Sequence, residues 1–402
     1  MYDFNYARIP PIYFGTEKIA RLPVIASELG AGHVLLVTGK SSLQTSGKFQ
    51  SIQAMLQDAG LETHSIICPT EPSTTFVDKT CAQFRAHNID VVIGIGGGSV
   101  IDAGKAVSAM LPHDNSIFDH LEGVGPNIAH SGIKKPYIAI PTTSGTGSEV
   151  TKNAVISEVG PAGYKKSLRH DNLIPDAVVV DGDLLVSCPQ DVTFACGMDA
   201  FTQLLEPYLS PKVSPLTETL VWSGFKSFVA SFPAVCESGS NDEKRREGMA
   251  YTALLSGVAL ANDGVGIVHG LASPIGGFFP IPHGVVCATL VAPSVRANLA
   301  ALRARDPESP AIRKMACLGA LLSSRGDEDE AKDCSSSQAQ EQNCDALLEI
   351  LDKWTVDFSV PRLSRYGICD QDLEKILNNA QNRNNPVTLT QGEIRKMLEE
   401  RL

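Results

Sequence analysis

The chain has 402 residues, of which 43% are hydrophobic and 20% are charged, and its net charge at pH 7 is −11. This length allows two domains and a large core, and the acidic balance argues against nucleic acid or an anionic membrane as a main partner. No apolar stretch reaches the roughly 20 residues of a membrane span, and ten scattered cysteines without a Cys-x-x-Cys pair indicate reduced thiols in a cytoplasmic protein.

The first 185 residues alternate between predicted strands and predicted helices. Apolar runs predict strands at 34–37, 64–67, 91–95, 137–140 and 177–180, and amphipathic stretches predict helices at 49–61 and 75–87. Such alternation indicates a parallel sheet with helices on both faces. We therefore predict an α/β domain over residues 1–185.

A glycine triplet at 96–98 follows the strand at 91–95 and precedes a helix predicted to begin at Ile101. Ser99 and Asp102 have the spacing of a capping box. Glycines let a ligand approach the backbone, and a helix start offers free N–H groups, so we expect an anion, above all a phosphate, to bind here. A purely structural turn at the helix start is the alternative.

Two better-known phosphate motifs do not fit this loop. A Walker A loop would need a hydroxyl side chain where Ala106 stands. A Rossmann fingerprint would need its third glycine at the position of Ser99. The loop is therefore neither of these.

A second polar loop follows the predicted strand at 137–140. Residues 141–149 contain five hydroxyl side chains and two glycines, a composition that suits phosphate and ribose. A Ser/Thr/Gly surface loop is the alternative. Ligands of open α/β sheets bind at the carboxyl ends of the strands, which is where both loops would lie.

Predicted strands largely disappear after residue 185, and we assign residues 186–402 to a helical domain. Its clearest amphipathic helices are predicted at 199–209, 215–228, 245–262 and 371–379. The segment 323–343 is polar and low in complexity, which predicts a solvated, mobile insertion to which we assign no function.

One group of residues in this second domain could bind a metal ion. Asp199 and Gln203 lie four positions apart on a predicted helix and share a face. His269 and His283 lie in apolar, glycine-flanked segments. Together they predict a divalent metal site, the alternative being histidines satisfied within the core. Beside a nicotinamide, such a metal would stabilise an alkoxide while the cofactor accepts the hydride.

These motifs resemble the iron-containing (group III) alcohol dehydrogenases, whose fold is shared with glycerol dehydrogenase and dehydroquinate synthase. Gly96–Lys105 is similar to the family's Gly-Gly-Gly-Ser-x-x-Asp-x-Ala-Lys, with Gly104 in place of alanine, and 141–149 is similar to its second cofactor loop. Residues 197–200 and both histidine segments match the metal-binding stretches in order and spacing. The resemblance implies a dinucleotide-binding domain, a helical domain and NAD(P)-dependent interconversion of alcohols and carbonyl compounds.

The resemblance also implies a role for each matching residue. The pyrophosphate would be held by Gly96, Gly97, Gly98 and Ser99 with Asp102 behind them, and the cofactor would be lined by Thr142, Thr143 and Thr146 with Lys165 near its ribose. The metal ligands, which would also be the catalytic residues, are Asp199, His269 and His283. Gln203 stands where the family has a fourth, histidine ligand, and Ser273 replaces a further histidine proposed to relay protons.

An amide is a neutral and poorer donor to iron or zinc than a histidine, so Gln203 leaves two alternatives open. One is a metal-free reductase of the same fold, and the other is a dinucleotide-binding protein that has lost catalysis. A lyase similar to dehydroquinate synthase would need Lys and Arg for its anionic substrate, and the stretches 199–210 and 264–284 contain neither.

The resemblance also bears on the cofactor and the partners. NAD-preferring relatives tend to carry an acid where Gly39 stands, so we expect NADP(H) to be accepted, with Lys40, Ser41 or Ser42 near its 2′-phosphate. The substrate is expected to be a small alcohol or aldehyde. A homodimer is a candidate assembly, because relatives are often dimers or larger.

Overall fold

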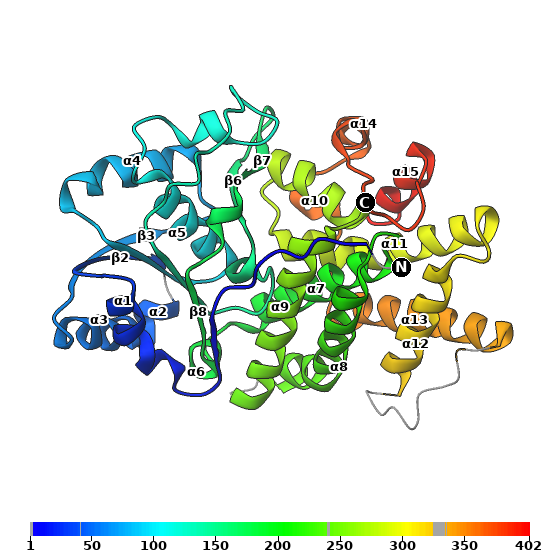
Figure 1. Ribbon diagram of the computed structural model, residues 1–402. Helices are drawn as coiled ribbons and strands as arrows, with labels where there is room; N and C mark the ends of the chain where they lie inside the picture. Colours follow the sequence, from blue (N-terminus) through cyan, green and yellow to red (C-terminus); the bar gives the residue numbers. More distant parts are fainter. Residues whose placement is uncertain (1–2, 41, 239–241, 325–333, 335) are drawn as a thin grey trace.

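A six-stranded parallel sheet forms the first half of the molecule, as predicted (Figure 1). The computed structural model describes residues 3–40, 42–238, 242–324, 334 and 336–402. In space the strands follow the order β1-β8-β5-β4-β2-β3. Their bounds are β1 Ile12–Phe14, β2 His33–Gly39, β3 Glu62–Cys68, β4 Val91–Gly96, β5 Tyr137–Pro141 and β8 Ala177–Val180.

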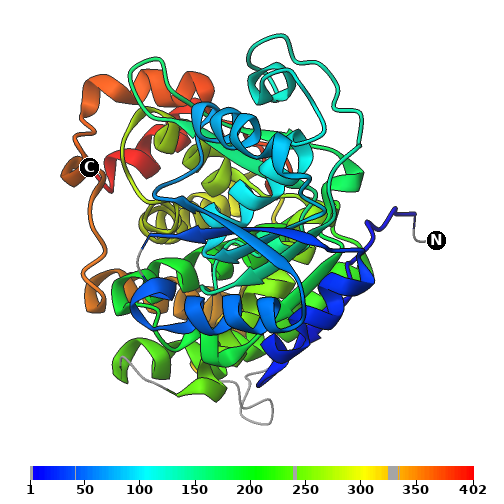
Figure 2. The same ribbon diagram turned by 90° about the vertical axis from the view of Figure 1, so that its left-hand side faces the viewer.

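Helices cover both faces of this sheet (Figure 2). Leu35 and Val37 of β2 pack toward α4 and α5, whereas Val34 and Leu36 pack toward α1 and α3, and all four side chains are fully buried. Burial on both faces explains why these strands read as continuous apolar runs. The helices are α1 Leu22–Glu28, α2 Ser42–Thr45, α3 Lys48–Asp58, α4 Thr74–Phe84 and α5 Gly98–Met110.

The direction of the chain through the sheet reverses between β2 and β4. From β2 the chain continues to the neighbouring β3, and from β4 it continues on the opposite side to β5. Thr38 of β2 pairs with Ile95 of β4, so Gly39 and Gly96 end their strands side by side. Open α/β sheets bind ligands at such a reversal, outside the carboxyl ends of the strands.

An antiparallel hairpin between β5 and β8 was not predicted. It consists of β6 (Asn153–Glu158) and β7 (Tyr164–Arg169). The only fully buried side chain of β7 is Leu168, so no apolar alternation marks this strand in the sequence. The hairpin matters for function because it carries Lys165.

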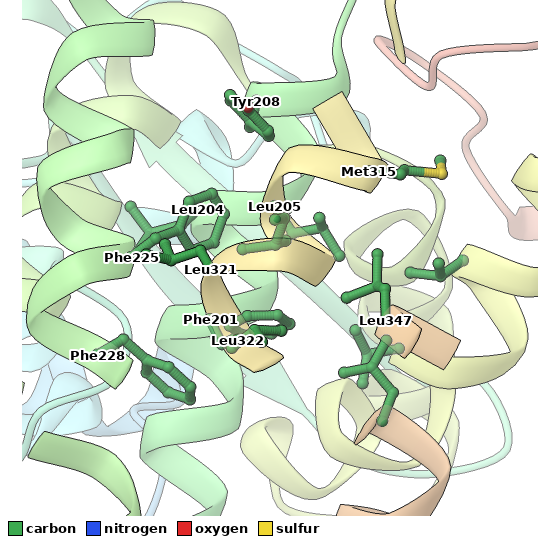
Figure 3. Close-up of a cluster of buried hydrophobic side chains, with 14 of the residues drawn as sticks. Phe201, Leu204, Leu205, Tyr208, Phe225, Phe228, Met315, Leu321, Leu322 and Leu347 are labelled. Carbon is green, nitrogen blue, oxygen red and sulfur yellow. The ribbon is translucent and has the colours of Figure 1, made fainter. Parts of the chain in front are cut away.

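The second half of the molecule is helical in its described part (Figure 1). Its core contains side chains of α7, α8, α12 and α13, including Phe201, Phe225 and Leu347 (Figure 3). The helices are α6 Gly182–Leu185, α7 Gln190–Leu209, α8 Pro215–Ser238, α9 Glu243–Asp263, α10 Ile267–Phe278, α11 His283–Arg305, α12 Pro310–Ser323, α13 Ser337–Asp357, α14 Asp370–Asn379 and α15 Gln391–Glu399.

Within the described residues, α11 alone is a single helix long and apolar enough to cross a membrane, and α9 with α10 passes the same test only as a pair bent by 98°. For α11, 78% of the apolar window is buried inside the molecule. A core helix of this kind has the same composition as a membrane span, because both are surrounded by apolar groups.

Two segments differ from the predicted organisation of the chain, namely the residues before β1 and the segment 323–343. The N–H of Ala7 donates a 2.6 Å hydrogen bond to Asn262 of α9, so the residues before β1 lie along the helical half (Figure 1). Of the polar segment 323–343, residues 325–333 and 335 lie outside the described residues. Residues 337–343 form the first turns of α13.

Candidate functional site

The glycine triplet lies at the start of α5. The helix begins at Gly98, with Gly97 as its N-cap, and not at Ile101 as predicted. Ser99 is therefore inside the first turn, and the predicted capping box with Asp102 does not form. Because Gly97 offers no side-chain cap, the first N–H groups of α5 stay available to a ligand.

The close approach of the two loops explains why glycine is needed here. A Cβ on Gly98 would lie 2.6 Å from Oγ1 of Thr146, and a Cβ on Gly96 would lie 2.6 Å from Cβ of Val100. The N–H of Thr142 donates a 2.9 Å hydrogen bond to the carbonyl of Gly96. The polar loop after β5 is therefore packed directly against the glycine triplet.

Lys105 fixes the second loop from inside the α/β half. Its side chain is buried, and Nζ donates hydrogen bonds to the carbonyl oxygens of Ser148 at 2.7 Å, Thr151 at 2.9 Å and Asn153 at 2.8 Å. The hydroxyl of Ser148 also donates to Asp102. Burial lowers the pKa of Lys105 to about 8. Lys105 thus has a positioning role that the sequence did not reveal.

A cavity of about 2050 Å³ is lined by residues of both halves. Ten of the predicted site residues lie on its wall, namely Gly98, Ser99, Asp102, Thr143, Thr146, Lys165, Asp199, Gln203, His269 and His283. Ser273 lines it as well. The other four, Gly39, Gly96, Gly97 and Thr142, are not among its lining residues. Their backbones form the strand ends and the helix start behind the wall.

Three predicted metal ligands converge from three helices. Asp199 of α7 lies with its Oδ1 atom 3.3 Å from Nε2 of His269 in α10 and 3.6 Å from Nε2 of His283, the first residue of α11. Asp199 is buried. Burial alone would raise its pKa, but the imidazole of His283 and that of His269 hold the pKa below its ordinary value.

Glu206 orients one of these imidazoles, and sequence analysis missed it. It lies two turns after Asp199 on α7, and its Oε2 is 2.6 Å from Nδ1 of His269. Its Oε1 accepts a 2.6 Å hydrogen bond from the N–H of Val268. Because Nδ1 of His269 faces Glu206, Nε2 is the nitrogen that faces Asp199.

This donor set fits a divalent metal ion. One carboxylate oxygen and two imidazole nitrogens face one another, and the second nitrogen of His269 is held by a carboxylate, which is a common outer-shell arrangement around zinc and related ions. The residues therefore match the chemistry of such an ion.

Gln203 makes contacts that the sequence did not predict, and Cys287 was not predicted as part of the site. Nε2 of Gln203 donates to the carbonyl of Thr146 at 2.7 Å and contacts Oγ of Ser256 at 3.0 Å, so this amide ties the second loop to the helical half. Cys287 lies with Sγ 3.3 Å from Oδ1 of Asp199 and belongs to the same group of donors. Burial raises the pKa of the Cys287 thiol to about 12. Its position four residues after His283 was the missed signal.

Lys165 is held at the cavity wall by an acidic partner. Its Nζ lies 2.5 Å from Oε1 of Glu71, whose Oε2 accepts a 2.6 Å hydrogen bond from Ser157. Burial alone would raise the pKa of Glu71, but Lys165 holds it below the ordinary value. Glu71 is distant in sequence and was not predicted.

Gly39 ends β2, and a Cβ there would make an ordinary 3.5 Å contact with Val100. Lys40 is exposed. Ser41 and the side chain of Ser42 lie outside the described part of the chain. Room for a side chain therefore exists at Gly39, so steric exclusion does not explain why glycine stands there.

Comparisons with known proteins agree with the fold and identify the family. Residues 10–182 match the family of iron-containing alcohol dehydrogenases, and residues 193–402 match the C-terminal domain of Fe-containing alcohol dehydrogenases. The chain is 31% identical to long-chain-alcohol dehydrogenase 1 of Geobacillus thermodenitrificans, covering 98% of this chain and 96% of that protein. It is 28% identical to an NADPH-dependent butanol dehydrogenase of Clostridium saccharobutylicum, covering 96% and 95% respectively.

The crystal structure of a 1,3-propanediol oxidoreductase superposes on the whole chain, covering 100% of both chains with a TM-score of 0.86 and 26% identity. The predicted combination of a parallel α/β domain and a helical domain is thereby confirmed. The chain belongs to the iron-containing alcohol dehydrogenase family and is an oxidoreductase that acts on alcohols.

Proposed function

We propose that the chain interconverts a small alcohol and its aldehyde or ketone with NAD(P) in the cavity between its two halves. The observation that carries this proposal is the wall of that cavity. It brings Gly98 and Ser99, at the start of α5, together with Asp199, His269 and His283 of the helical half. A cofactor site and a candidate metal site thus open onto one space.

The α/β half would hold the dinucleotide. The backbone of Gly96, Gly97, Gly98 and Ser99 binds the pyrophosphate at the N-terminus of α5, where free N–H groups favour an anion. The side chains of Thr143 and Thr146 would line the cofactor, with Lys165 near its ribose, and Thr142 would hold the second loop against Gly96 behind them. Asp102 holds the same loop through Ser148. Lys105 keeps the second loop in place.

The helical half would hold the divalent ion through Asp199, His269 and His283. When bound, the ion lowers the pKa of the substrate hydroxyl and the nicotinamide exchanges the hydride. Glu206 keeps the Nδ1 proton of His269 and so fixes which nitrogen faces the ion. Gln203 holds the loop at Thr146 against α7.

We propose further that NADP(H) is accepted. No carboxylate stands at Gly39 to repel a 2′-phosphate, and Lys40 follows it at the end of β2, beside the site where the strand direction reverses. A cytoplasmic location and a homodimer stay predictions.

The experiment is a panel of alcohols, with reduced nicotinamide followed by absorbance, run on protein stripped of metal and on protein reloaded with zinc or iron(II). His283→Ala should lose metal uptake and turnover yet still bind the dinucleotide, whereas His87→Ala, at an exposed position, should behave as wild type. Turnover by the stripped protein would instead establish a metal-free reductase. Well-folded protein that binds neither dinucleotide in calorimetry would refute the proposal.

A further inference from the structure

Cys287 lies within the group of candidate metal ligands. Sγ of Cys287 is 3.3 Å from Oδ1 of Asp199, 3.9 Å from Nε2 of His269 and 3.9 Å from Nε2 of His283. All four donor atoms lie within 4.8 Å of one another. Cys287 follows His283 by four residues in α11, so both side chains lie on one face of the helix and point at Asp199 of α7.

These distances match the edges of a tetrahedron around one ion. Zinc binds sulfur at about 2.3 Å and nitrogen or oxygen at about 2.0–2.2 Å, so its ligand atoms in a tetrahedral site lie about 3.3–3.6 Å apart. The distances from Oδ1 of Asp199 to the two Nε2 atoms are 3.3 and 3.6 Å, and the distance to Sγ of Cys287 is 3.3 Å. The two sulfur–nitrogen distances, 3.9 Å each, exceed the range by a few tenths of an ångström.

The amide nitrogen of Gln203 is engaged at the second loop. This Nε2 atom contacts the carbonyl of Thr146 at 2.7 Å and Oγ of Ser256 at 3.0 Å, which accounts for both of its N–H groups. These contacts give Gln203 a structural task at the second loop. The thiol of Cys287 is the only other cysteine, histidine or carboxylate donor that the described residues bring into the group of Asp199 and the two histidines.

We propose that Cys287 is the fourth protein ligand of the metal centre, beside one carboxylate and two imidazoles, so that the ion would have to expand to five-coordinate for the substrate hydroxyl to reach it. This inference rests on the proposed function in one respect, namely that a divalent ion binds at Asp199, His269 and His283. Thiolate and imidazole together form a ligand set that suits zinc. On binding, the thiol proton is released to solvent and Sγ bonds to the ion, so no redox change is involved.

Cobalt(II) is the probe, because a thiolate ligand gives it an intense charge-transfer absorption in the near ultraviolet that nitrogen and oxygen ligands do not give. The full-length protein, stripped of metal and loaded with one equivalent of cobalt(II), should show this absorption. Cys287→Ser should lose it, and Cys317→Ser, which changes a half-buried cysteine of α12, should keep it.

Metal affinity, measured by competition with a chelator, supplies a second readout that does not depend on activity. Cys287→Ala should weaken zinc binding by more than about 100-fold, since even losing an outer-shell partner costs about 10–100-fold. Gln203→Ala should weaken it by less. Circular dichroism of the metal-free proteins identifies any variant that fails to fold. The cobalt spectrum of the wild type tests the proposal even if a variant does not fold, because it requires no substitution.

The outcomes separate this inference from the function on which it rests. Wild-type protein that binds cobalt without the charge-transfer absorption would overturn the role of Cys287 and leave the metal site intact. Zinc affinity lost in Gln203→Ala but retained in Cys287→Ala would assign the fourth ligand to Gln203 instead. Wild-type protein that takes up no divalent ion would overturn both the inference and the proposed metal centre.

Discussion

Glu206 accepts a hydrogen bond from Nδ1 of His269 over 2.6 Å, and this contact decides which nitrogen of the imidazole faces Asp199. The same carboxylate also accepts from the N–H of Val268 at the start of α10. A single side chain of α7 therefore fixes both the position of α10 and the orientation of its imidazole.

Glu206→Gln should weaken metal binding by about 10–100-fold, because the amide has one accepting oxygen where the carboxylate has two. One of the two donors, either Nδ1 of His269 or the N–H of Val268, then loses its partner. Chelator competition measures the effect. Glu218→Gln, which changes a partly exposed ion pair with Lys314, is the matched control and should bind metal as wild type does. Equal affinities for the two variants would contradict the orienting role.

Gly98→Val should raise the KM for the dinucleotide by about tenfold or more, because its Cβ would meet Thr146 at 2.6 Å and overpacking costs about 1–3 kcal/mol. Initial rates at varied cofactor concentration provide the measurement. Gly392→Val, at a position in α15 with nothing within 4 Å of an added Cβ, should leave KM unchanged. An unaltered KM in Gly98→Val would exclude the proposed pyrophosphate site.

Gly39→Asp should shift preference toward NAD, lowering kcat/KM for NADP(H) relative to NAD(H) by at least about tenfold through repulsion of the 2′-phosphate. The added Cβ makes only an ordinary 3.5 Å contact with Val100, so the variant should fold. Gly39→Ala controls for the added volume alone. Wild-type protein that turns over NAD(H) but shows no measurable turnover of NADP(H) would refute acceptance of NADP(H).

Lys105→Met should reduce the free energy of unfolding by about 3–5 kcal/mol, because the buried carboxyl group of Asp102 loses its cationic partner. Three carbonyl oxygens, those of Ser148, Thr151 and Asn153, would lose their donor. Urea denaturation measures the change. Lys353→Met removes a lysine that is 70% exposed and should change stability by less than about 0.5 kcal/mol. A similarly small effect at Lys105 would show that the second loop does not depend on it.

The free energy of unfolding should fall by about 1–2 kcal/mol between pH 7.5 and pH 5, owing to His130. Burial and the neighbouring His113 lower the pKa of His130 from 6.5 to about 4. The N–H of Gly132 donates to its Nδ1, which must therefore stay unprotonated. The unfolded chain takes up a proton near pH 6.5 and the folded chain only near pH 4, so stability is lost as the pH falls through this window.

Urea denaturation at the two pH values measures this loss. His130→Gln lacks the titrating group and should show a smaller decrease than the wild type. If both proteins lost the same stability on acidification, another group would be responsible.

Much of the fold was predictable because the relevant forces act locally. The strand β2, buried on both faces, appears in the sequence as an apolar run, and the glycines at 96–98 mark a close approach that the structure places at the start of α5. Strand β7 was missed because Leu168 is its only fully buried side chain. The predicted start of α5 at Ile101 was three residues too late. The helix already begins at Gly98, which has no apolar side chain to mark it in the sequence.

For the site, the sequence by itself indicated which residues carry the chemistry. An aspartate, two glycine-flanked histidines and a glycine-rich phosphate loop are recognised from residue type and local sequence alone. Only the tertiary structure decided which atoms meet. Lys165 pairs with Glu71 across 94 positions, and Cys287 reaches Asp199 across 88. Local periodicity reports which face of a helix is buried, but the crossing of α7, α10 and α11 sets the distances between their side chains, and that crossing follows from packing of the whole core.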